Sequence, residues 1–392
     1  MQVLETKVQQ LVGHRRGYLV GRKAGSTLTE GRETGNRPRS ASHSANLRFP
    51  RGSGYDAGLK RPREEETRPM PHRVLTPDSH GDETMKIAHD MLPDGLELVT
   101  APHGRPEFWN LLKDADFYIG AGQFKHGPEF YQQAPKLKLV QTLSAGYNTY
   151  DLEAARAAGV PICNNGGANA TAVAEHALLL MLAVSRKLTW VHEGVVSGRW
   201  RGNDFNSAKL YELEDKTLGI VGLGNIGKKV ARRAKAFDMR IQYYDVNRMT
   251  TDQEDALGVR FVLLPELLKT SDIVSLHVPL DLSTHNLIGE RELSLMKPTA
   301  ILINTCRGPV VEEKALYQAL RDEKIMGAGL DVMREEPPQP DHELFSLKNA
   351  IFSPHSAGPT WDNHPKRWRN AFDNCERVAR GQKPFWIVPE LR

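Results

Sequence analysis

Hydrophobic residues in the second half of the chain form short, nearly continuous runs separated by longer amphipathic stretches. The runs are rich in Ile, Val and Leu and do not alternate with polar residues. Such runs are typical of strands in a parallel sheet that helices cover on both faces. The predicted strands are 218–221, 239–244, 273–276, 300–303, 327–330 and 350–352. This pattern predicts a doubly wound α/β domain.

The residues before this domain show a similar alternation. Short apolar runs are separated by helical stretches, and we predict strands at 71–77, 96–99, 117–120, 137–143 and 160–163. A long helix is predicted over 172–190, since its apolar residues recur at helical spacing. The fold class is therefore α/β, with two Rossmann-like domains built on doubly wound parallel sheets.

Residues 1–69 differ from the rest in composition. They contain 14 Lys or Arg and 7 Asp or Glu, and they show no sustained apolar period. A segment rich in Arg, Gly, Ser and Thr cannot bury enough apolar surface to fold. We expect a disordered basic tail that is dispensable, or an extension upstream of a chain that begins at Met70. The remaining residues carry a net charge of −3, so the basic character belongs to the tail.

Composition narrows the class of protein. Hydrophobic residues make up 40% and charged residues 26%, as in globular proteins. The longest strongly apolar run, 177–184, is too short to span a membrane. Three widely spaced cysteines argue against a disulfide framework and against a metal site, and favour a reducing compartment. We expect a cytoplasmic protein with no membrane contact and no specific nucleic-acid partner.

A glycine motif indicates a dinucleotide. Gly222, Gly224 and Gly227 form G-x-G-x-x-G directly after a predicted strand and at the start of a predicted helix, 227–237. The first glycine permits the tight turn, the second lets the backbone approach a pyrophosphate, and the third allows the helix to pack closely on the strand. The amides at the helix start would then hold the phosphate charge.

Asp245 follows the next predicted strand, at the place where an acid binds the adenosine ribose. Its carboxylate would repel a 2′-phosphate, so NAD is favoured over NADP. Arg248 lies three residues later and would soften that preference, unless it is only a solvated surface charge.

Residues with reactive or charged side chains follow three further predicted strands: Arg307, Glu336 and His355. Ligands in such sheets bind beyond the carboxyl ends of the strands, so these side chains would converge on a nicotinamide ring. Each has a plain alternative: an ion pair for Arg307, a helix start for Glu336 and a satisfied strand-end imidazole for His355. Three other histidines are read as structural: His176, His277 and His285.

With the glycine motif, these stretches make the chain resemble the D-isomer-specific 2-hydroxyacid dehydrogenases. The likeness runs from about Met70 to the C-terminus and includes Ser144-Ala-Gly-Tyr-Asn-Thr-Tyr-Asp and Asn169-Ala-Thr-Ala-Val-Ala-Glu-His. It implies that Arg307 binds the substrate carboxylate, that His355 is the acid and base, and that Glu336 orients His355. Substrate contacts would also come from Ser144, Ala145 and Gly146. The resemblance and the glycine motif together assign cofactor contacts to Gly222, Gly224, Asn225, Ile226, Gly227, Asp245, Val278, Thr305, Cys306 and Asp331.

The resemblance also implies a division into domains. A substrate domain would comprise 70–170 and be completed by 356–392, and an NAD-binding domain would comprise 171–355. Members of the family usually dimerise through the nucleotide domain, so a homodimer is expected.

The substrate stays open between glyoxylate, hydroxypyruvate, pyruvate and a bulkier 2-oxo acid. Family members that oxidise 3-phosphoglycerate often carry an Arg after the strand that matches 117–119, where this chain has Gly120-Ala-Gly. A phosphorylated substrate is therefore disfavoured. Two other functions on the same scaffold also stay open: an NAD(H)-sensing, corepressor-like binding protein, and a phosphite dehydrogenase.

Overall fold

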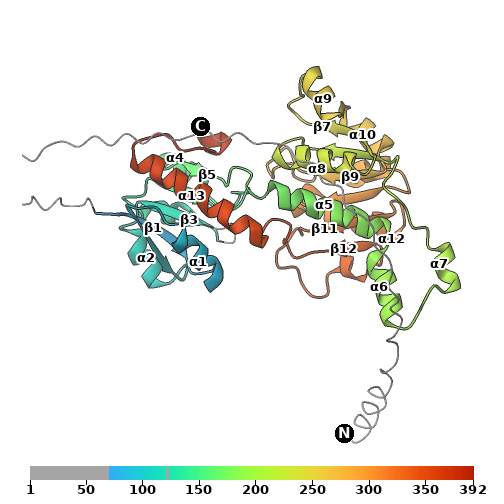
Figure 1. Cartoon of the computed structure of the whole chain (residues 1–392), viewed down its shortest axis with the longest axis horizontal. Coiled ribbons are helices and arrows are strands. Elements are labelled where there is room, and N and C mark those ends of the chain that lie inside the picture. Colours follow the sequence, from blue (N-terminus) through green and yellow to red (C-terminus); the bar gives the residue numbers. More distant parts are fainter. Residues whose placement is uncertain (1–69, 121, 123) are drawn as a thin grey trace, which may run out of the picture. The chain divides into compact units, whose positions relative to one another are not determined.

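The computed structural model describes residues 70–120, 122 and 124–392, which contain two parallel β-sheets. The α/β class with two Rossmann-like sheets is thereby confirmed, and Figure 1 shows helices lying against both sheets. The predicted tail over 1–69 lies outside the described residues. In the described part of the chain, no helix is long and apolar enough to cross a membrane.

The first sheet has five strands in the order β2-β1-β3-β4-β5. They are β1 (His72–Pro77), β2 (Leu96–Ala101), β3 (Phe117–Gly120), β4 (Leu139–Thr142) and β5 (Ile162–Cys163). The helices between them are α1 (Asp82–Asp90), α2 (Pro106–Leu112), α3 (Pro128–Gln132) and α4 (Leu152–Ala158). Local chemistry sets the bounds of α4, because the Asp151 carboxylate accepts a hydrogen bond from the amide of Ala154 and Gly159 ends the helix in a left-handed conformation.

The end of the chain returns to this first sheet. Helix α13 (His364–Ala379) packs against α1 and β4, and its inward face carries Trp368, Phe372 and Cys375 into the core of that sheet. Figure 1 shows α13, in red, beside α1. Residues far apart in the sequence therefore share one core.

The second sheet has seven strands in the order β12-β11-β10-β9-β6-β7-β8. They are β6 (Thr217–Val221), β7 (Arg240–Tyr244), β8 (Arg260–Phe261), β9 (Ile273–Leu276), β10 (Ile301–Asn304), β11 (Gly327–Leu330) and β12 (Ala350–Phe352). The helices of this part are α5 (Ala170–Ser185), α6 (Leu188–Val196), α7 (Asn203–Ser207), α8 (Asn225–Lys235), α9 (Thr251–Leu257), α10 (Leu264–Thr270), α11 (Glu290–Leu295) and α12 (Glu313–Arg321). The described residues also contain short 3-10 helices at η1 (Gly308–Val310), η2 (Glu343–Ser346), η3 (Trp361–Asn363) and η4 (Pro389–Leu391).

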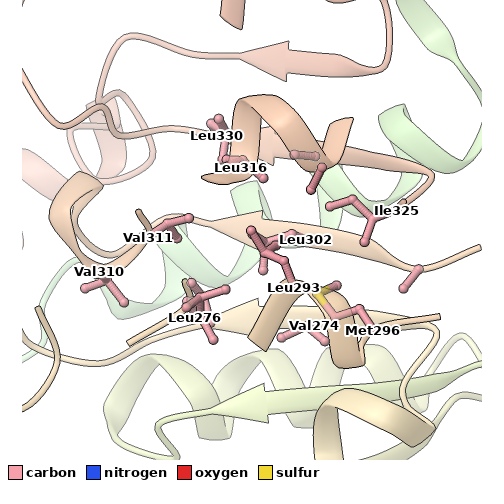
Figure 2. Close-up of a cluster of buried hydrophobic side chains, with 14 of the residues drawn as sticks. Val274, Leu276, Leu293, Met296, Leu302, Val310, Val311, Leu316, Ile325 and Leu330 are labelled. Carbon is pink, nitrogen blue, oxygen red and sulfur yellow. The ribbon is translucent and has the colours of Figure 1, made fainter. Parts of the chain in front are cut away.

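Both faces of the second sheet are buried, as its uninterrupted apolar strands predict. On one face, aliphatic side chains of β9, β10 and β11 pack against α11 and α12 (Figure 2). On the other, α5 and α8 pack on β6 and β10. Removal of this apolar area from water is the main term that stabilises the layered arrangement.

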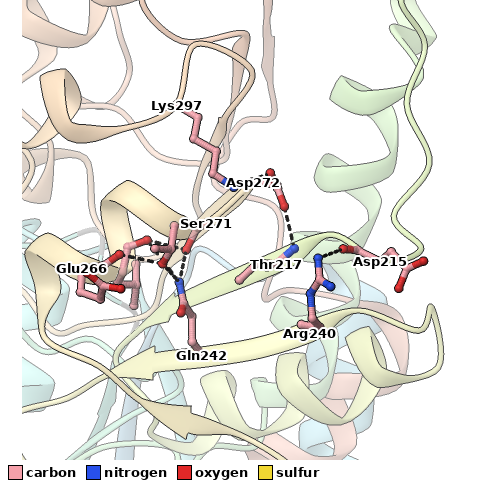
Figure 3. Close-up of polar contacts among 10 residues, drawn as sticks. Asp215, Thr217, Arg240, Gln242, Glu266, Ser271, Asp272 and Lys297 are labelled. Carbon is pink, nitrogen blue, oxygen red and sulfur yellow. Dashed lines mark hydrogen bonds and ion pairs between the residues drawn. The ribbon is translucent and has the colours of Figure 1, made fainter.

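Polar contacts tie the amino ends of the strands together (Figure 3). Oδ2 of Asp272 accepts a hydrogen bond from the amide of Thr217 at 2.8 Å. Oδ1 of Asp272 forms an ion pair with Nζ of Lys297 at 2.8 Å. The buried amide of Gln242 donates to Thr270 and Ser271. These contacts hold the edge of the sheet opposite to the one where the candidate site lies.

Two expected helix bounds were wrong. The helix predicted over 172–190 is broken, because Lys187 adopts a left-handed conformation and separates α5 from α6. Apolar periodicity continues across the break, so the pattern alone did not reveal it. The helix after the glycine motif begins at Asn225 and not at Gly227.

Gly227 lets α8 pack closely against β6 and the turn that follows it. A Cβ there would lie 2.2 Å from the carbonyl oxygen of Gly222, a backbone atom that cannot yield. We expect Gly227→Ala to lower the free energy of unfolding by about 1–3 kcal/mol, as overpacking of a core does. Chemical denaturation monitored by circular dichroism measures this change.

The matched control is Gly81→Ala. Gly81 precedes α1 with no heavy atom within 4 Å of the added Cβ and with a φ of −63°. Its effect should stay within about 0.5 kcal/mol. Equal stabilities of the two variants would contradict the close packing at Gly227.

Candidate active site

Parallel pairing aligns the ends of three neighbouring strands. Asn304 of β10 is paired with Leu330 of β11, and Leu330 is paired with Phe352 of β12. The loops after these strands therefore leave the same edge of the sheet. They carry Arg307, Glu336 and His355, the three residues predicted from the sequence.

The turn that carries Arg307 is built by its neighbours. The Asn304 side chain accepts from the amide of Cys306 and donates to the carbonyl of Arg307 at 2.9 Å. A Cβ on Gly308 would lie 1.9 Å from the carbonyl oxygen of Met333, so only glycine allows this turn to approach the loop after β11. The loops that carry Arg307 and Glu336 are thus held against each other.

Arg307 reaches the turn after β4 of the first sheet. The Nε of Arg307 donates to Oδ1 of Asn148 at 3.2 Å, and Nη1 donates to the carbonyl oxygen of Cys306, the preceding residue, at 2.6 Å. The guanidinium lies so close to Gly146 that a Cβ there would be 1.4 Å from Nη2. The structure therefore brings Arg307 together with Gly146 of the predicted turn Ser144–Gly146.

Glu336 and His355 form a pair. Nδ1 of His355 lies 2.7 Å from Oε2 of Glu336, and the amide of Met333 donates to Oε1 of Glu336 at 3.1 Å. Burial acts to raise the pKa of Glu336, but the hydrogen bonds from His355 and Met333 and the charges of His355 and Arg307 outweigh it and hold the pKa below its ordinary value. An ionised Glu336 accepts the proton of Nδ1, which leaves Nε2 of the half-exposed His355 free to face a ligand.

A buried carboxylate shapes the loop that holds His355. Asp331 accepts hydrogen bonds from the Ser353 hydroxyl at 2.6 Å and from the amides of Ser356 and Ala357 at 2.9 and 3.0 Å. His355 itself has a φ of +52°, in the left-handed region, and its amide donates to the carbonyl of Asp331 at 2.8 Å. These contacts fix a conformation that a histidine rarely adopts.

His176 belongs to the same network, although its place in the sequence does not indicate this. Its Nε2 lies 2.8 Å from the Ser353 hydroxyl and 3.5 Å from Asp331. The sequence predicts only a structural role for His176, because nothing in the spacing connects α5 with the loop after β12. His277, directly after β9, is hydrogen-bonded through its Nε2 to the Ser275 hydroxyl at 2.9 Å.

The glycine motif forms a cradle that fits a dinucleotide. Gly222 has a φ of +93°, and a Cβ on it would meet the carbonyl of His277 at 2.6 Å. A Cβ on Gly224 would meet nothing within 4 Å, so the space beside this residue is open to a ligand. Gly224 precedes α8 and supplies no side-chain cap, which leaves the first amides of α8 available for a phosphate.

Asp245 lies beside this cradle. Its Oδ2 accepts from the amide of Leu223 at 2.7 Å, and its Oδ1 accepts from the amide of Asn247 at 2.9 Å. Arg248 is turned to Glu254, with Nε 3.0 Å from Oε1 of that carboxylate, and its guanidinium stacks over Phe261. Arg248 is thus already paired within its own domain.

The other predicted cofactor residues line the same edge. Val278 lies against the cradle, 2.9 Å from a Cβ placed on Gly222, and Asn225 lies beside Gly167. Ile226 packs on the core beneath α8. The Thr305 hydroxyl is buried without a hydrogen-bond partner among the described residues, as expected of a group that awaits a ligand. Burial raises the pKa of the Cys306 thiol to about 11, so this residue is no nucleophile.

The predicted substrate turn is ordered by its own polar groups. The Ser144 hydroxyl donates to the carbonyl of Gly146 at 2.7 Å, and the Thr142 hydroxyl donates to the carbonyl of Ser144 at 2.6 Å. Its partly exposed backbone can accept an anion beside Arg307. Within residues 70–120, 122 and 124–392, no cluster of three or more His, Cys, Asp or Glu has the arrangement that holds a metal.

Comparison with known proteins agrees with this geometry. Residues 178–357 match the family model described as D-isomer specific 2-hydroxyacid dehydrogenase, NAD binding domain. A glyoxylate reductase of Korarchaeum cryptofilum is 38% identical over 329 residues, which cover 84% of this chain and 96% of that protein. A glyoxylate reductase of Thermococcus litoralis is 40% identical over 299 residues, covering 75% and 90%.

Solved structures show the same relation. The crystal structure of a glyoxylate reductase from Paecilomyes thermophila aligns with a TM-score of 0.72 at 29% identity, covering 82% of this chain and 99% of that one. A D-lactate dehydrogenase from Aquifex aeolicus, complexed with NAD and lactic acid, aligns with a TM-score of 0.69 at 29% identity, covering 79% and 96%. The chain belongs to the D-isomer-specific 2-hydroxyacid dehydrogenase family and is an NAD-dependent oxidoreductase of that family.

Proposed function

We propose that this enzyme interconverts a small 2-oxo acid and the corresponding D-2-hydroxy acid, with Arg307, Glu336 and His355 as its catalytic residues. The observation that carries the proposal is the hydrogen-bonded pair of His355 and Glu336, which leaves the same sheet edge as Arg307. An acid–base pair next to a fixed cation is the arrangement that reduction of a carbonyl beside a carboxylate requires.

Each residue has a distinct role in this proposal. Arg307 binds the substrate carboxylate against the turn Ser144–Gly146 and polarises the carbonyl. NADH, when bound in the Gly222–Gly227 cradle, supplies the hydride. Nε2 of His355 gives a proton to the carbonyl oxygen during reduction and takes it back during oxidation. Glu336 orients the ring through Nδ1 and stabilises the imidazolium.

The relatives support a small substrate. Glyoxylate reductases from several organisms align over most of their own length, and a D-lactate dehydrogenase shares the fold. The names of the glyoxylate reductases support a short 2-oxo acid, although a D-mandelate dehydrogenase, whose substrate is bulkier, shares the fold. They do not favour phosphite oxidation or an NAD(H)-sensing binding protein.

We propose a substrate domain of 70–170 completed by 356–392, and an NAD-binding domain of 171–355. We also propose a cytoplasmic homodimer. Exposed apolar side chains on and after α6 would give a dimer a surface: Leu188, Val195, Val196 and Trp200.

The full chain should oxidise NADH in the presence of at least one 2-oxo acid from a panel of glyoxylate, hydroxypyruvate, pyruvate and longer analogues. His355→Ala should lower kcat about 1,000-fold, since a positioned acid contributes between two and four powers of ten. NADH binding, followed by its fluorescence, should stay unchanged. Absorbance of the nicotinamide at saturating substrate measures kcat.

The control is His285→Ala, because His285 is exposed in a loop after β9 and should leave kcat unchanged. Unaltered turnover in His355→Ala would remove the proposed proton donor. Tight NADH binding without turnover of any 2-oxo acid would indicate a dinucleotide-sensing protein. Reduction of NAD with phosphite alone would indicate a phosphite dehydrogenase.

Arg307→Lys should lower kcat/KM for the best 2-oxo acid about 10- to 100-fold, chiefly through KM. A lysine keeps the charge but loses the planar, two-pronged donor that grips a carboxylate. Steady-state kinetics give the two constants separately. Arg321→Lys, on the exposed face of α12, is the control and should match the native enzyme. A native KM in Arg307→Lys would show that the carboxylate is held elsewhere.

Asp245→Ala should shift the ratio of kcat/KM for NADH over NADPH toward NADPH about tenfold or more. The change removes the carboxylate that would repel a 2′-phosphate, and it also frees the amide of Leu223. The ratio is the relevant readout, because loosening of the glycine turn affects both cofactors. Asp255→Ala, exposed on α9, should keep the native ratio. An unshifted ratio in Asp245→Ala would assign cofactor selection to other residues.

A further inference from the structure

A mostly buried glutamate that the proposed mechanism does not use binds the loop that carries Glu336. Glu313 is the first residue of α12, and its side chain is 16% exposed. Its Oε2 accepts a hydrogen bond from the backbone amide of Arg334 at 2.9 Å. Arg334 lies in the loop after β11, two residues before Glu336. Glu313 thus ties α12 to the loop that delivers a proposed catalytic residue.

Two consecutive amides of this loop donate to carboxylates. The amide of Met333 donates to Oε1 of Glu336 at 3.1 Å, and the next amide, that of Arg334, donates to Glu313. The other oxygen of Glu336, Oε2, lies 2.7 Å from Nδ1 of His355. Because the peptide group between Met333 and Arg334 is planar, a fixed amide of Arg334 restricts the rotation of Met333. The bond to Glu313 therefore steadies the amide that holds Glu336.

The same peptide group lies against the turn of Arg307. A Cβ placed on Gly308 would be 1.9 Å from the carbonyl oxygen of Met333 and 2.5 Å from the amide nitrogen of Arg334. Gly308 directly follows Arg307 in the sequence. The peptide group between Met333 and Arg334 is thus fixed by contact with Gly308 and by the hydrogen bond to Glu313.

His342 holds the other oxygen of Glu313. Its Nε2 lies 2.5 Å from Oε1 of Glu313, and its Nδ1 accepts a hydrogen bond from the amide of Leu344 at 3.3 Å. A ring nitrogen that accepts carries no proton, so the proton of this imidazole is on Nε2 and is donated to Glu313. Both carboxylate oxygens of Glu313 therefore bind donors from the chain that follows β11.

We propose that Glu313 is a positioning residue that acts through the amide of Arg334 to hold Glu336 against His355, with His342 as its support. This inference rests on the proposed function, because it requires Glu336 to orient His355. Glu313 has no direct contact with substrate or cofactor in this proposal. Its loss should therefore affect proton transfer, and not the binding of NADH or of the substrate carboxylate.

The test is a double-mutant cycle in the full chain, with NADH and the best 2-oxo acid. Glu313→Ala should lower kcat about 10- to 100-fold, as small displacements of catalytic groups do. KM for the 2-oxo acid and the affinity for NADH, followed by its fluorescence, should stay near their native values.

Glu336→Gln should itself lower kcat, and Glu313→Ala should then have no further effect in that background. A residue that acts through Glu336 has nothing left to position once the carboxylate is gone. A mere loss of stability would reduce the amount of folded enzyme by a similar factor in both backgrounds. Non-additivity of the two changes therefore separates a positioning role from a structural one.

Two further variants serve as rescue and control. Glu313→Gln keeps an oxygen that can accept from the amide of Arg334, so it should recover most of the kcat that Glu313→Ala loses. A kcat as low as that of Glu313→Ala would contradict the role of this bond. Glu290→Ala removes an exposed glutamate that is the first residue of α11, as Glu313 is of α12, and should keep the native kcat.

The outcomes separate this inference from the proposed function. A native kcat in Glu313→Ala, or an equal loss in both backgrounds, would overturn the positioning role and leave the proposed function intact. His342→Ala takes the place of Glu313→Ala in the cycle if the latter does not fold, and should lower kcat only where Glu336 is present. A native kcat in Glu336→Gln, or no turnover of any 2-oxo acid by the native chain, would overturn the proposed mechanism and the positioning role with it.

Discussion

Parallel pairing of β10, β11 and β12 is the constraint on which the candidate site depends. The register of these strands fixes where each loop leaves the sheet, and the loops deliver Arg307, Glu336 and His355 to one edge. The pairing is in turn held by burial of both sheet faces and by polar contacts at the opposite edge. A rigid scaffold of this kind leaves only the loops free to vary in chemistry.

Asp331 holds the loop after β12 in the conformation that orients the side chain of His355. Its buried carboxylate accepts three hydrogen bonds from residues 353–357 and so stabilises the left-handed backbone of His355. His176 extends the same network to α5. The imidazole that faces the proposed substrate is therefore supported from beneath by a helix and two loops.

Residues from outside the first sheet contact the turn that follows β4. Arg307, from the second sheet, packs on Gly146 and bonds to Asn148. Arg367, from the C-terminal helix, bonds to Leu143 of the same turn. One short turn is thus flanked by two guanidinium groups that lie 60 residues apart in the sequence.

The sequence by itself determined the α/β class, most strands of both sheets and the glycine turn followed by Asp245, and it predicted Arg307, Glu336 and His355 at one edge of the sheet. These features depend on local chemistry: apolar runs select buried strands, and glycines select backbone conformations. The tertiary structure alone decided the break at Lys187, the link from His176 to Ser353, and the placement of Arg367 beside Leu143. Each of these depends on packing between elements distant in the chain, and neither spacing nor periodicity along the sequence records which distant side chains will meet.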